Sequence, residues 1–263
     1  MRNTFEVRRR IALGLAVLGG SLSLALAARA GPPFITDDPQ PVDPGHWEVY
    51  GFSAGAGARA GISGLGPSIE VNYGAAPNLQ LHAIGGLAYD SPSGQGTRMG
   101  LSDTELGVKY RFITPGKDDW FPQVGVFPLV EIPTGDAKRG LGGGYTAAFL
   151  PVWVQKDLGK WTTYGGGGYW INPGSGNRDF WFTGWLVQRQ VTDKLALGGE
   201  VFHQTSSMVG HDETSGFNLG GQYDLTEHYH LLFSAGRGGM LRAIDAASVT
   251  NPFTYYLAFQ HTF

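Results

Sequence analysis

The chain ends in residues 253–263, FTYYLAFQHTF, in which the polarity of the side chains alternates from one residue to the next. One set of alternate positions holds Phe253, Tyr255, Leu257, Phe259, His261 and Phe263. The other set holds Thr254, Tyr256, Ala258, Gln260 and Thr262. Successive side chains of a strand point to opposite faces, so this period of two predicts a β-strand. Its aromatic face is too apolar to be a solvated one.

The same alternation occurs in residues 101–112, where the charged side chains all fall on a single face. The apolar face of this segment holds Leu106, Val108, Tyr110 and Phe112. The charged face holds Asp103, Glu105, Lys109 and Arg111. In a soluble sandwich the charged face would contact water, whereas in a membrane barrel it faces the lumen and the apolar face contacts lipid.

About twelve such segments follow one another, each near the ~9–11 residues that a tilted membrane-spanning strand needs. They begin near His46, Pro67, Leu79, Leu101, Trp120, Tyr145, Trp161, Asp179, Leu195, Ser215, Tyr229 and Pro252. Short connections (74–78, 114–118, 158–160, 192–194 and 226–228) alternate with longer ones (58–66, 91–100, 133–144, 172–178, 206–214 and 239–251). Bacterial outer-membrane barrels have short periplasmic turns and longer outer loops. The sequence therefore predicts one all-β domain, a transmembrane antiparallel barrel of about twelve strands with both termini on the periplasmic side.

The composition excludes several other classes of protein. Glycine accounts for 42 of 263 residues and aromatic residues for 13 %, which fits a bent sheet with aromatic girdles better than a disordered chain. The absence of cysteine excludes disulfides and cysteine-ligated metals. Acidic residues (22) outnumber basic ones (19), so nucleic acid is not an expected partner.

The first thirty residues have the organisation of a secretory signal peptide. Arg2 and residues 8–10 form a basic stretch, residues 11–28 form an apolar run, and Ala28 and Ala30 form an A-x-A cleavage pattern. A transmembrane helix is the competing interpretation, but the run is short for one. We expect residues 1–30 to be removed on export to the bacterial outer membrane, residues 31–45 to form a periplasmic or lumen segment, and residues 46–263 to form the barrel.

Alternation also predicts which charged residues face the lumen. These are Glu48, Glu70, Asp103, Glu105, Lys109, Arg111, Glu200 and Asp224. Two interpretations remain open: the charges line a polar passage, or they pair across the lumen and fill it. Eight strands leave an interior filled by side chains and sixteen leave an open channel, so twelve strands predict a narrow or gated passage. The Pro- and Asp-rich residues 32–44 are a candidate partial plug.

No motif for catalysis, a metal or a cofactor stands out, and we expect a protein that is not an enzyme. The nearest set for nucleophilic chemistry is His203 with Ser206 and Ser207, and Asn218 follows along the chain. Because triads are defined by geometry rather than by spacing, an outer-membrane lipid-modifying enzyme stays open as an alternative function. A structural barrel with a closed lumen is another.

Two stretches carry a resemblance to a known family. Residues 34–39, FITDDP, with residues 44–48, PGHWE, resemble the mature N-terminus of the outer-membrane family named "MetA-pathway of phenol degradation". Residues 70–74, EVNYG, with residues 78–81, NLQL, are similar to that family's second and third strands. The resemblance implies a transporter of small, aromatic or hydrophobic solutes, and it brings no catalytic residues.

The C-terminal stretch resembles the signal by which the barrel-assembly machinery recognises outer-membrane proteins. Its terminal Phe263 and the alternating Tyr255, Leu257 and Phe259 carry this similarity. The resemblance implies the assembly machinery as a partner during biogenesis. The predicted membrane barrel, with its apolar face and outer loops, implies outer-membrane lipid and lipopolysaccharide as its later partners. The solute itself and the oligomeric state are not predicted by the sequence.

Overall fold

The computed structural model describes residues 33–116, 119–238 and 252–263. The predicted signal peptide with Ala28 and Ala30, and the predicted loop 239–251, lie outside the described residues. In the described part of the chain, no helix is long and apolar enough to span a membrane.

The described residues form fourteen β-strands and one short 3-10 helix, η1 (Ala137–Arg139). The strands are β1 (Trp47–Ala58), β2 (Gly61–Ala76), β3 (Leu79–Pro92), β4 (Arg98–Leu101), β5 (Thr104–Ile113), β6 (Gln123–Val126), β7 (Leu129–Ile132), β8 (Ala147–Leu158), β9 (Trp161–Ile171), β10 (Phe180–Gln190), β11 (Leu195–Gln204), β12 (Thr214–Asp224), β13 (Tyr229–Arg237) and β14 (Phe253–Thr262).

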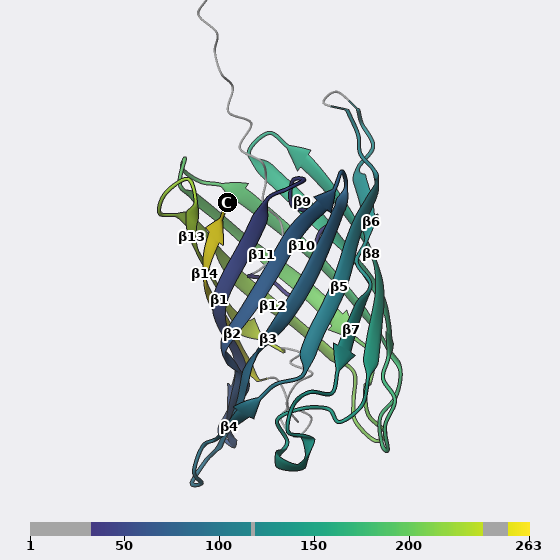
Figure 1. Cartoon of the computed structure of the whole chain (residues 1–263), viewed down its shortest axis with the longest axis vertical. Coiled ribbons are helices and arrows are strands. Elements are labelled where there is room, and N and C mark those ends of the chain that lie inside the picture. Colours follow the sequence, from purple (N-terminus) through teal and green to yellow (C-terminus); the bar gives the residue numbers. More distant parts are fainter. Residues whose placement is uncertain (1–32, 117–118, 239–251) are drawn as a thin grey trace, which may run out of the picture.

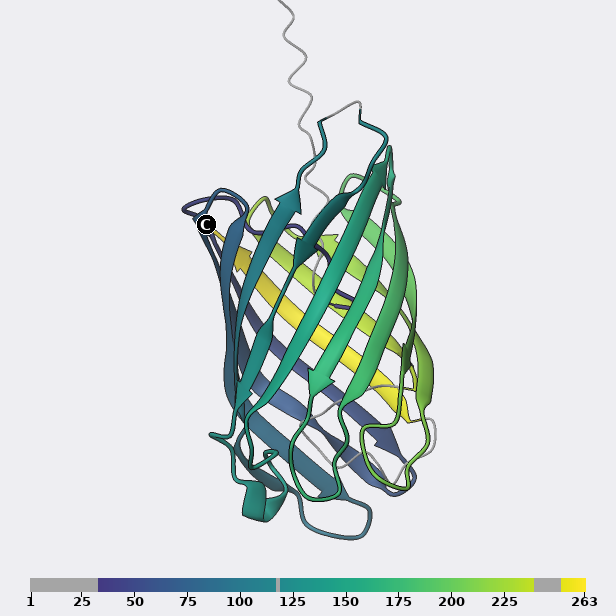
Figure 2. The same cartoon turned by 90° about the vertical axis from the view of Figure 1, so that its right-hand side faces the viewer.

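The strands close into a single antiparallel barrel (Figures 1 and 2). β4 and β5 both pair with β3 and together occupy one position in the wall. β6 and β7 both pair with β5 and β8 and occupy the next position. Fourteen strands therefore fill twelve positions, and the pairing of β3 with β5 closes the ring. The prediction of a barrel of about twelve antiparallel strands is confirmed.

The alternation that predicted the last strand holds in the structure. On β14, Leu257 and Phe259 are 52 % and 47 % exposed, whereas Ala258 and Gln260 are almost fully buried. The exposed set forms the outer surface of the wall and the buried set faces the interior. A wide outer belt of apolar residues runs around the barrel in the same way, as membrane-spanning barrels require.

The two rims of the barrel differ in their connections. The short-turn rim carries the turns at 77–78, 159–160, 191–194 and 225–228, together with the connection 114–122. Both ends of the barrel sequence meet at this rim, because Trp47 and Phe263 exchange two backbone hydrogen bonds of 2.7 and 3.0 Å. In Figure 1 the label C marks this end of the barrel. The opposite end, which we call the long-loop rim, carries the loop with η1.

One predicted loop is wrong. Residues 58–66 form no long loop, because β1 runs to Ala58 and β2 starts at Gly61. The glycine-rich stretch 61–66 suggested a loop, but here glycine permits close contact between strands: a Cβ on Gly64 would lie 2.1 Å from the carbonyl oxygen of Ala54. The connection after β5 is in turn longer than predicted, since β6 begins only at Gln123.

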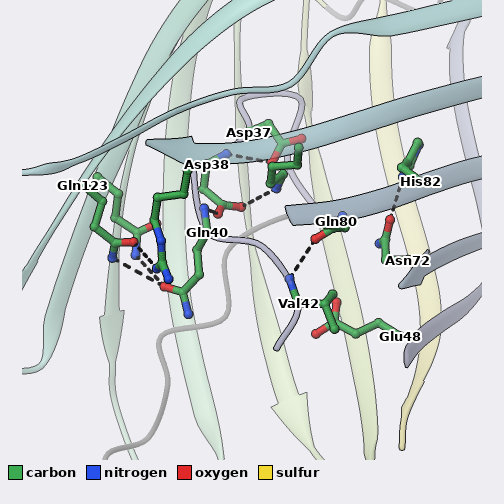
Figure 3. Close-up of polar contacts among 12 residues, drawn as sticks. Asp37, Asp38, Gln40, Val42, Glu48, Asn72, Gln80, His82 and Gln123 are labelled. Carbon is green, nitrogen blue, oxygen red and sulfur yellow. Dashed lines mark hydrogen bonds and ion pairs between the residues drawn. The ribbon is translucent and has the colours of Figure 1, made fainter. Parts of the chain in front are cut away.

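The interior is lined by two apolar clusters on opposite parts of the wall. The aromatic cluster comprises Phe127, Ala147, Phe149, Trp153, Trp170, Phe180, Phe182 and Phe202 on the β6–β11 side. The second cluster comprises Tyr50, Phe52, Ala54, Leu232 and Ala258, from β1, β13 and β14. Residues 33–46, which we call the N-terminal segment, lie inside the barrel and are bonded to β11, β13 and β5. Figure 3 shows part of this segment with the polar side chains around it. These interior features form the candidate site.

Candidate functional site

The N-terminal segment is held at the middle of the barrel by Glu200 of β11. One carboxylate oxygen accepts the backbone N–H of Ile35 at 3.0 Å and the other accepts that of Thr36 at 2.7 Å. Glu200 and Thr36 are 2 % and 0 % exposed. From β13, the hydroxyl of Ser234 donates to the carbonyl oxygen of Pro33 at 2.5 Å. Hydrogen bonds to a charged acceptor are stronger than neutral ones, so Glu200 is the main anchor.

A buried ion pair attaches the next residues to the opposite wall. Lys109 Nζ of β5 lies 2.9 Å from Asp37 Oδ1 and 3.4 Å from Asp38 Oδ2, and 4.9 Å from the centre of the Phe127 ring. Burial raises the pKa of the Asp38 carboxyl above its usual range, while the nearby Lys109 ammonium opposes this shift. The Lys109 ammonium therefore lies between two carboxyl groups, of which Asp37 is the closer.

Neutral contacts hold the segment closer to the short-turn rim (Figure 3). The backbone N–H of Val42 donates to Gln80 Oε1 at 2.9 Å. Gln40 accepts long hydrogen bonds of 3.5 Å from both Gln123 and Gln155. The segment then leaves the lumen beside β2, where Gly74 is bonded to the backbone of residues 45–46. Its contacts thus span β2, β3, β5, β6, β8, β11 and β13.

At two glycines of the wall, the absence of a side chain provides the space that the segment occupies. A Cβ on Gly184 of β10 would lie 2.1 Å from Thr36 Oγ1. A Cβ on Gly74 of β2 would lie 2.0 Å from the carbonyl oxygen of Asp43. Glycine is needed where another backbone approaches a strand this closely. Here the wall leaves space in its interior and the N-terminal segment fills that space.

A second polar group lies on the neighbouring wall. Asn72 of β2 donates to Glu70 at 2.8 Å and presents its Oδ1 to His82 Nδ1 at 2.7 Å. The other ring nitrogen of His82 lies 2.9 Å from Glu105 Oε1. Both nitrogens of His82 face oxygen acceptors, an arrangement that a doubly protonated ring satisfies. This group links β2, β3 and β5.

The structure places the eight charged residues singled out from the sequence in three regions. Glu70, Glu105, Lys109 and Glu200 lie in the groups just described. Glu48, Arg111 and Asp224 make contacts toward the short-turn rim, with Tyr50, with Asn78 and Gln123, and with His230 and Gln222. Asp103 accepts the backbone N–H groups of Gly135 and Gly143 and thereby fixes the loop that contains η1.

The sequence did not reveal the aromatic side of the lumen. A cavity of about 120 Å³ lies there, between the N-terminal segment and the wall. It is lined by Ile35, Asp37, Phe127, Leu129, Phe149, Pro151, Trp153, Trp170 and Phe182. The available signal was that residues 180–187, FWFTGWLV, are apolar at almost every position, so both faces of this strand are apolar. Alternation alone, applied to charged residues, points only to the polar side.

His203 lies on the outer face of β11, since it alternates with the buried Phe202 and Gln204. Its Nδ1 is 2.9 Å from Ser215 Oγ of β12, and its Nε2 is 3.8 Å from Glu213. The serines considered from the sequence make no bond to it that the structure records: Ser206 donates instead to the carbonyl oxygen of Met208. Asn218 lies in the lumen, where it donates to Glu200 at 2.6 Å.

No protein-family model and no curated protein matches the sequence. Among solved structures, the COG4313 outer membrane channel from Pseudomonas putida F1 is 18 % identical, with a TM-score of 0.63, over 89 % of this chain and 100 % of that chain. The translocator domain of the autotransporter NalP from Neisseria meningitidis is 10 % identical, with a TM-score of 0.40, over 83 % of this chain and 87 % of that one. The Pseudomonas putida toluene transporter TodX is 9 % identical, with a TM-score of 0.38, over 82 % and 87 %. The chain has the fold of an outer-membrane β-barrel.

Proposed function

We propose that the protein is an outer-membrane channel for the passive passage of small solutes, and that the N-terminal segment is its plug. This proposal rests on the observation that part of the lumen is filled by the N-terminal segment rather than by side chains of the wall. The wall leaves space at Gly74 and Gly184, and a separate stretch of chain occupies it. A barrel closed for structural reasons alone would fill its interior with its own side chains.

The segment is attached in a way that suits a reversible plug. If the signal peptide is removed after Ala30, the segment is covalently tied to the barrel only where it enters β1. Its noncovalent contacts are worth about 0.5–1.5 kcal/mol each, or about 1.5–3 for those to charged groups. Ordering each residue costs about 1–2 kcal/mol. The free energy gained from the contacts and the entropic cost of ordering the segment are of similar size. We therefore expect a minor population of molecules in which the segment is released.

We further propose small hydrophobic and aromatic solutes as the cargo. The sequence resemblance to the MetA-pathway family implies such solutes. The aromatic cluster supports them, because it gives the lumen an apolar surface on the β6–β11 side. The charged groups are already engaged: Glu70 and Glu105 accept hydrogen bonds, and Lys109 is paired with Asp37.

The remaining parts of the proposal concern export and assembly. Residues 1–30 direct export and are removed, and the assembly machinery recognises the terminal strand through Tyr255, Leu257, Phe259 and Phe263. The short-turn rim then faces the periplasm, as in other bacterial barrels. Three of these four side chains, those of Leu257, Phe259 and Phe263, are 47–55 % exposed on the outer face, where a binding partner reaches them during assembly.

Solute flux into vesicles tests the proposed channel. The mature chain and a variant lacking residues 31–42 are reconstituted at equal amounts, and the entry of a panel of ions, sugars and neutral aromatic alcohols is measured. We expect measurable entry with the mature chain and faster entry with the shortened one. Native folding of both is checked by the heat-dependent migration of unboiled protein on gels. Absence of flux for every solute with both proteins overturns the proposal.

One observation favours a second function, the hydrolysis of lipid esters at the outer face. His203 lies between Ser215 and Glu213, an arrangement of a nucleophile (Ser215), a base (His203) and a carboxylate that orients the base (Glu213). Ser215 Oγ would attack the ester carbonyl and pass its proton through His203 to the leaving alcohol, and water would then release the acid. Phospholipid hydrolysis by the wild-type protein, and its loss in Ser215→Ala, tests this function. No hydrolysis by the wild-type protein excludes it.

A further inference from the structure

The cavity of about 120 Å³ beside the N-terminal segment has the size of a small-molecule site. An apolar cavity of about 150 Å³ in a protein interior holds one benzene molecule. The present volume is of the same order and therefore suits a single aromatic ring. Its walls come from β7 to β10, from Phe127 just before β7 and from the segment, so a bound molecule would touch the barrel and the plug at once.

The geometry of the walls favours an aromatic occupant over an aliphatic one. Phe149 and Trp170 stack with ring centres 4.8 Å apart, whereas Phe149 and Phe182 meet edge to face at 6.2 Å. Trp153 and Phe182 meet at an interplanar angle of 68°. The cavity is thus lined by rings in both orientations. Aromatic pairs gain stability from stacked and edge-to-face contacts, which an aliphatic ring cannot make in the same way.

Among the described residues, the one charged residue at the cavity predicts a neutral occupant. Asp37 is the charged residue in the lining, and its carboxylate already pairs with Lys109 at 2.9 Å. A charged solute would lose its hydration there without gaining a free counter-charge.

We propose that this cavity binds a neutral solute with a single aromatic ring. This inference rests on the proposed passage of solutes, for which it specifies the chemical class and the position of a binding site. Ile35 belongs to the plug and also to the lining. Occupancy of the cavity and seating of the segment are therefore coupled, since release of the segment removes one wall of the site.

Binding is tested with benzyl alcohol as the probe. The full mature chain is placed in lipid nanodiscs, and saturation transfer from protein to ligand is measured by NMR against empty nanodiscs. Cyclohexylmethanol replaces the aromatic ring by an aliphatic one, 1-naphthalenemethanol doubles the ring, and benzoate adds a charge. We expect benzyl alcohol to bind, and the other three to bind about tenfold or more weakly. Equal signals for all four compounds, or none for benzyl alcohol, overturn the inference.

A substitution then locates the site. Leu129→Trp fills the cavity from β7 and is expected to abolish the benzyl alcohol signal. Leu106→Trp, on the neighbouring strand but 44 % exposed on the outer face, is the matched control and should retain the signal. Retained binding in a folded Leu129→Trp protein places the ligand elsewhere and overturns the inference. If that variant does not fold, Leu129→Phe serves the same purpose.

The two proposals fail in different ways. Vesicle flux measured on the same preparations reports on the channel, whereas saturation transfer reports on the cavity. Flux without benzyl alcohol binding overturns the binding site and leaves the channel. Binding without any flux overturns the channel and leaves a ligand site in a closed barrel.

Discussion

The carboxylate of Glu200 accepts the backbone N–H of Thr36 at 2.7 Å, across 164 positions of the sequence. Both residues are almost completely buried at the middle of the barrel. Glu200 anchors one end of the segment, and the Lys109 ion pair anchors the residues that follow. The closed state of the proposed channel therefore depends on a few polar contacts that single substitutions remove.

Glu200→Gln keeps the shape of the side chain but removes its charge and one acceptor oxygen. A hydrogen bond to a charged group is worth about 1.5–3 kcal/mol, so we expect the population with a released segment to rise about tenfold or more. Vesicle flux and proteolysis of the segment measure this change. Asp224→Asn is the control, since Asp224 bonds to Gln222 and His230 and not to the segment. An equal effect of both substitutions would contradict the role of Glu200.

Gly184→Val introduces a side chain where the segment lies. A Cβ there would be 2.1 Å from Thr36 Oγ1, so the segment must shift, whereas the valine itself suits a strand. We expect faster flux and faster cleavage of the segment, with the barrel still folded. Gly51→Val is the matched control, because no atom lies within 4 Å of a Cβ at that glycine. Unchanged flux in Gly184→Val would show that the segment does not restrict passage.

If the outer belt contacts lipid, the destabilisation caused by a charged substitution should depend on its depth in the membrane. Leu219 of β12 is 65 % exposed at the middle of its strand, and Leu225 is 44 % exposed at the short-turn rim. Arginine on the lipid face costs about 2–4 kcal/mol at the bilayer midplane and about 0–1 near the interface. Leu219→Arg should therefore lower the free energy of unfolding in liposomes much more than Leu225→Arg. Equal losses would contradict the assignment of the belt to lipid.

Phe263→Ser tests the assembly signal. Its side chain is 55 % exposed, so its loss removes little packing from the folded barrel. We expect near-normal stability after refolding in detergent but slower insertion by the assembly machinery into vesicles. Thr262→Ser, at the adjacent inward position, serves as the control. Normal insertion of the Phe263→Ser protein would rule out this residue as the signal.

The fold was predictable because its main signal is local. Alternation in residues 253–263 follows from strand geometry alone, and the structure confirms it at Leu257 and Gln260. The hairpin of β1 and β2 was missed because its cause is not local. Glycines such as Gly64 are required by contacts with a neighbouring strand, and the sequence alone does not distinguish them from loop glycines.

The site was less predictable for the same physical reason. Charged residues on alternating strands indicated Lys109 and Glu200, but their partners, Asp37 and Thr36, lie far away in the sequence. The aromatic cavity is built from four strands, Phe127 and the segment, and no short motif encodes it. His203 meets Ser215 across a strand pair, whereas sequence distance favoured the nearer serines.

A disulfide between the plug and the wall tests the central claim most directly. The chain has no cysteine, and a Cβ on Gly184 would lie 3.2 Å from that of Thr36, close to the Cβ separation of disulfides, which averages about 3.8 Å. Flux through the Thr36→Cys, Gly184→Cys protein is measured before and after addition of a reductant, with each single variant as a control. We predict low flux when oxidised and a rise on reduction, confined to the double variant. Equal flux in both states, with the disulfide verified, would contradict a plugged channel.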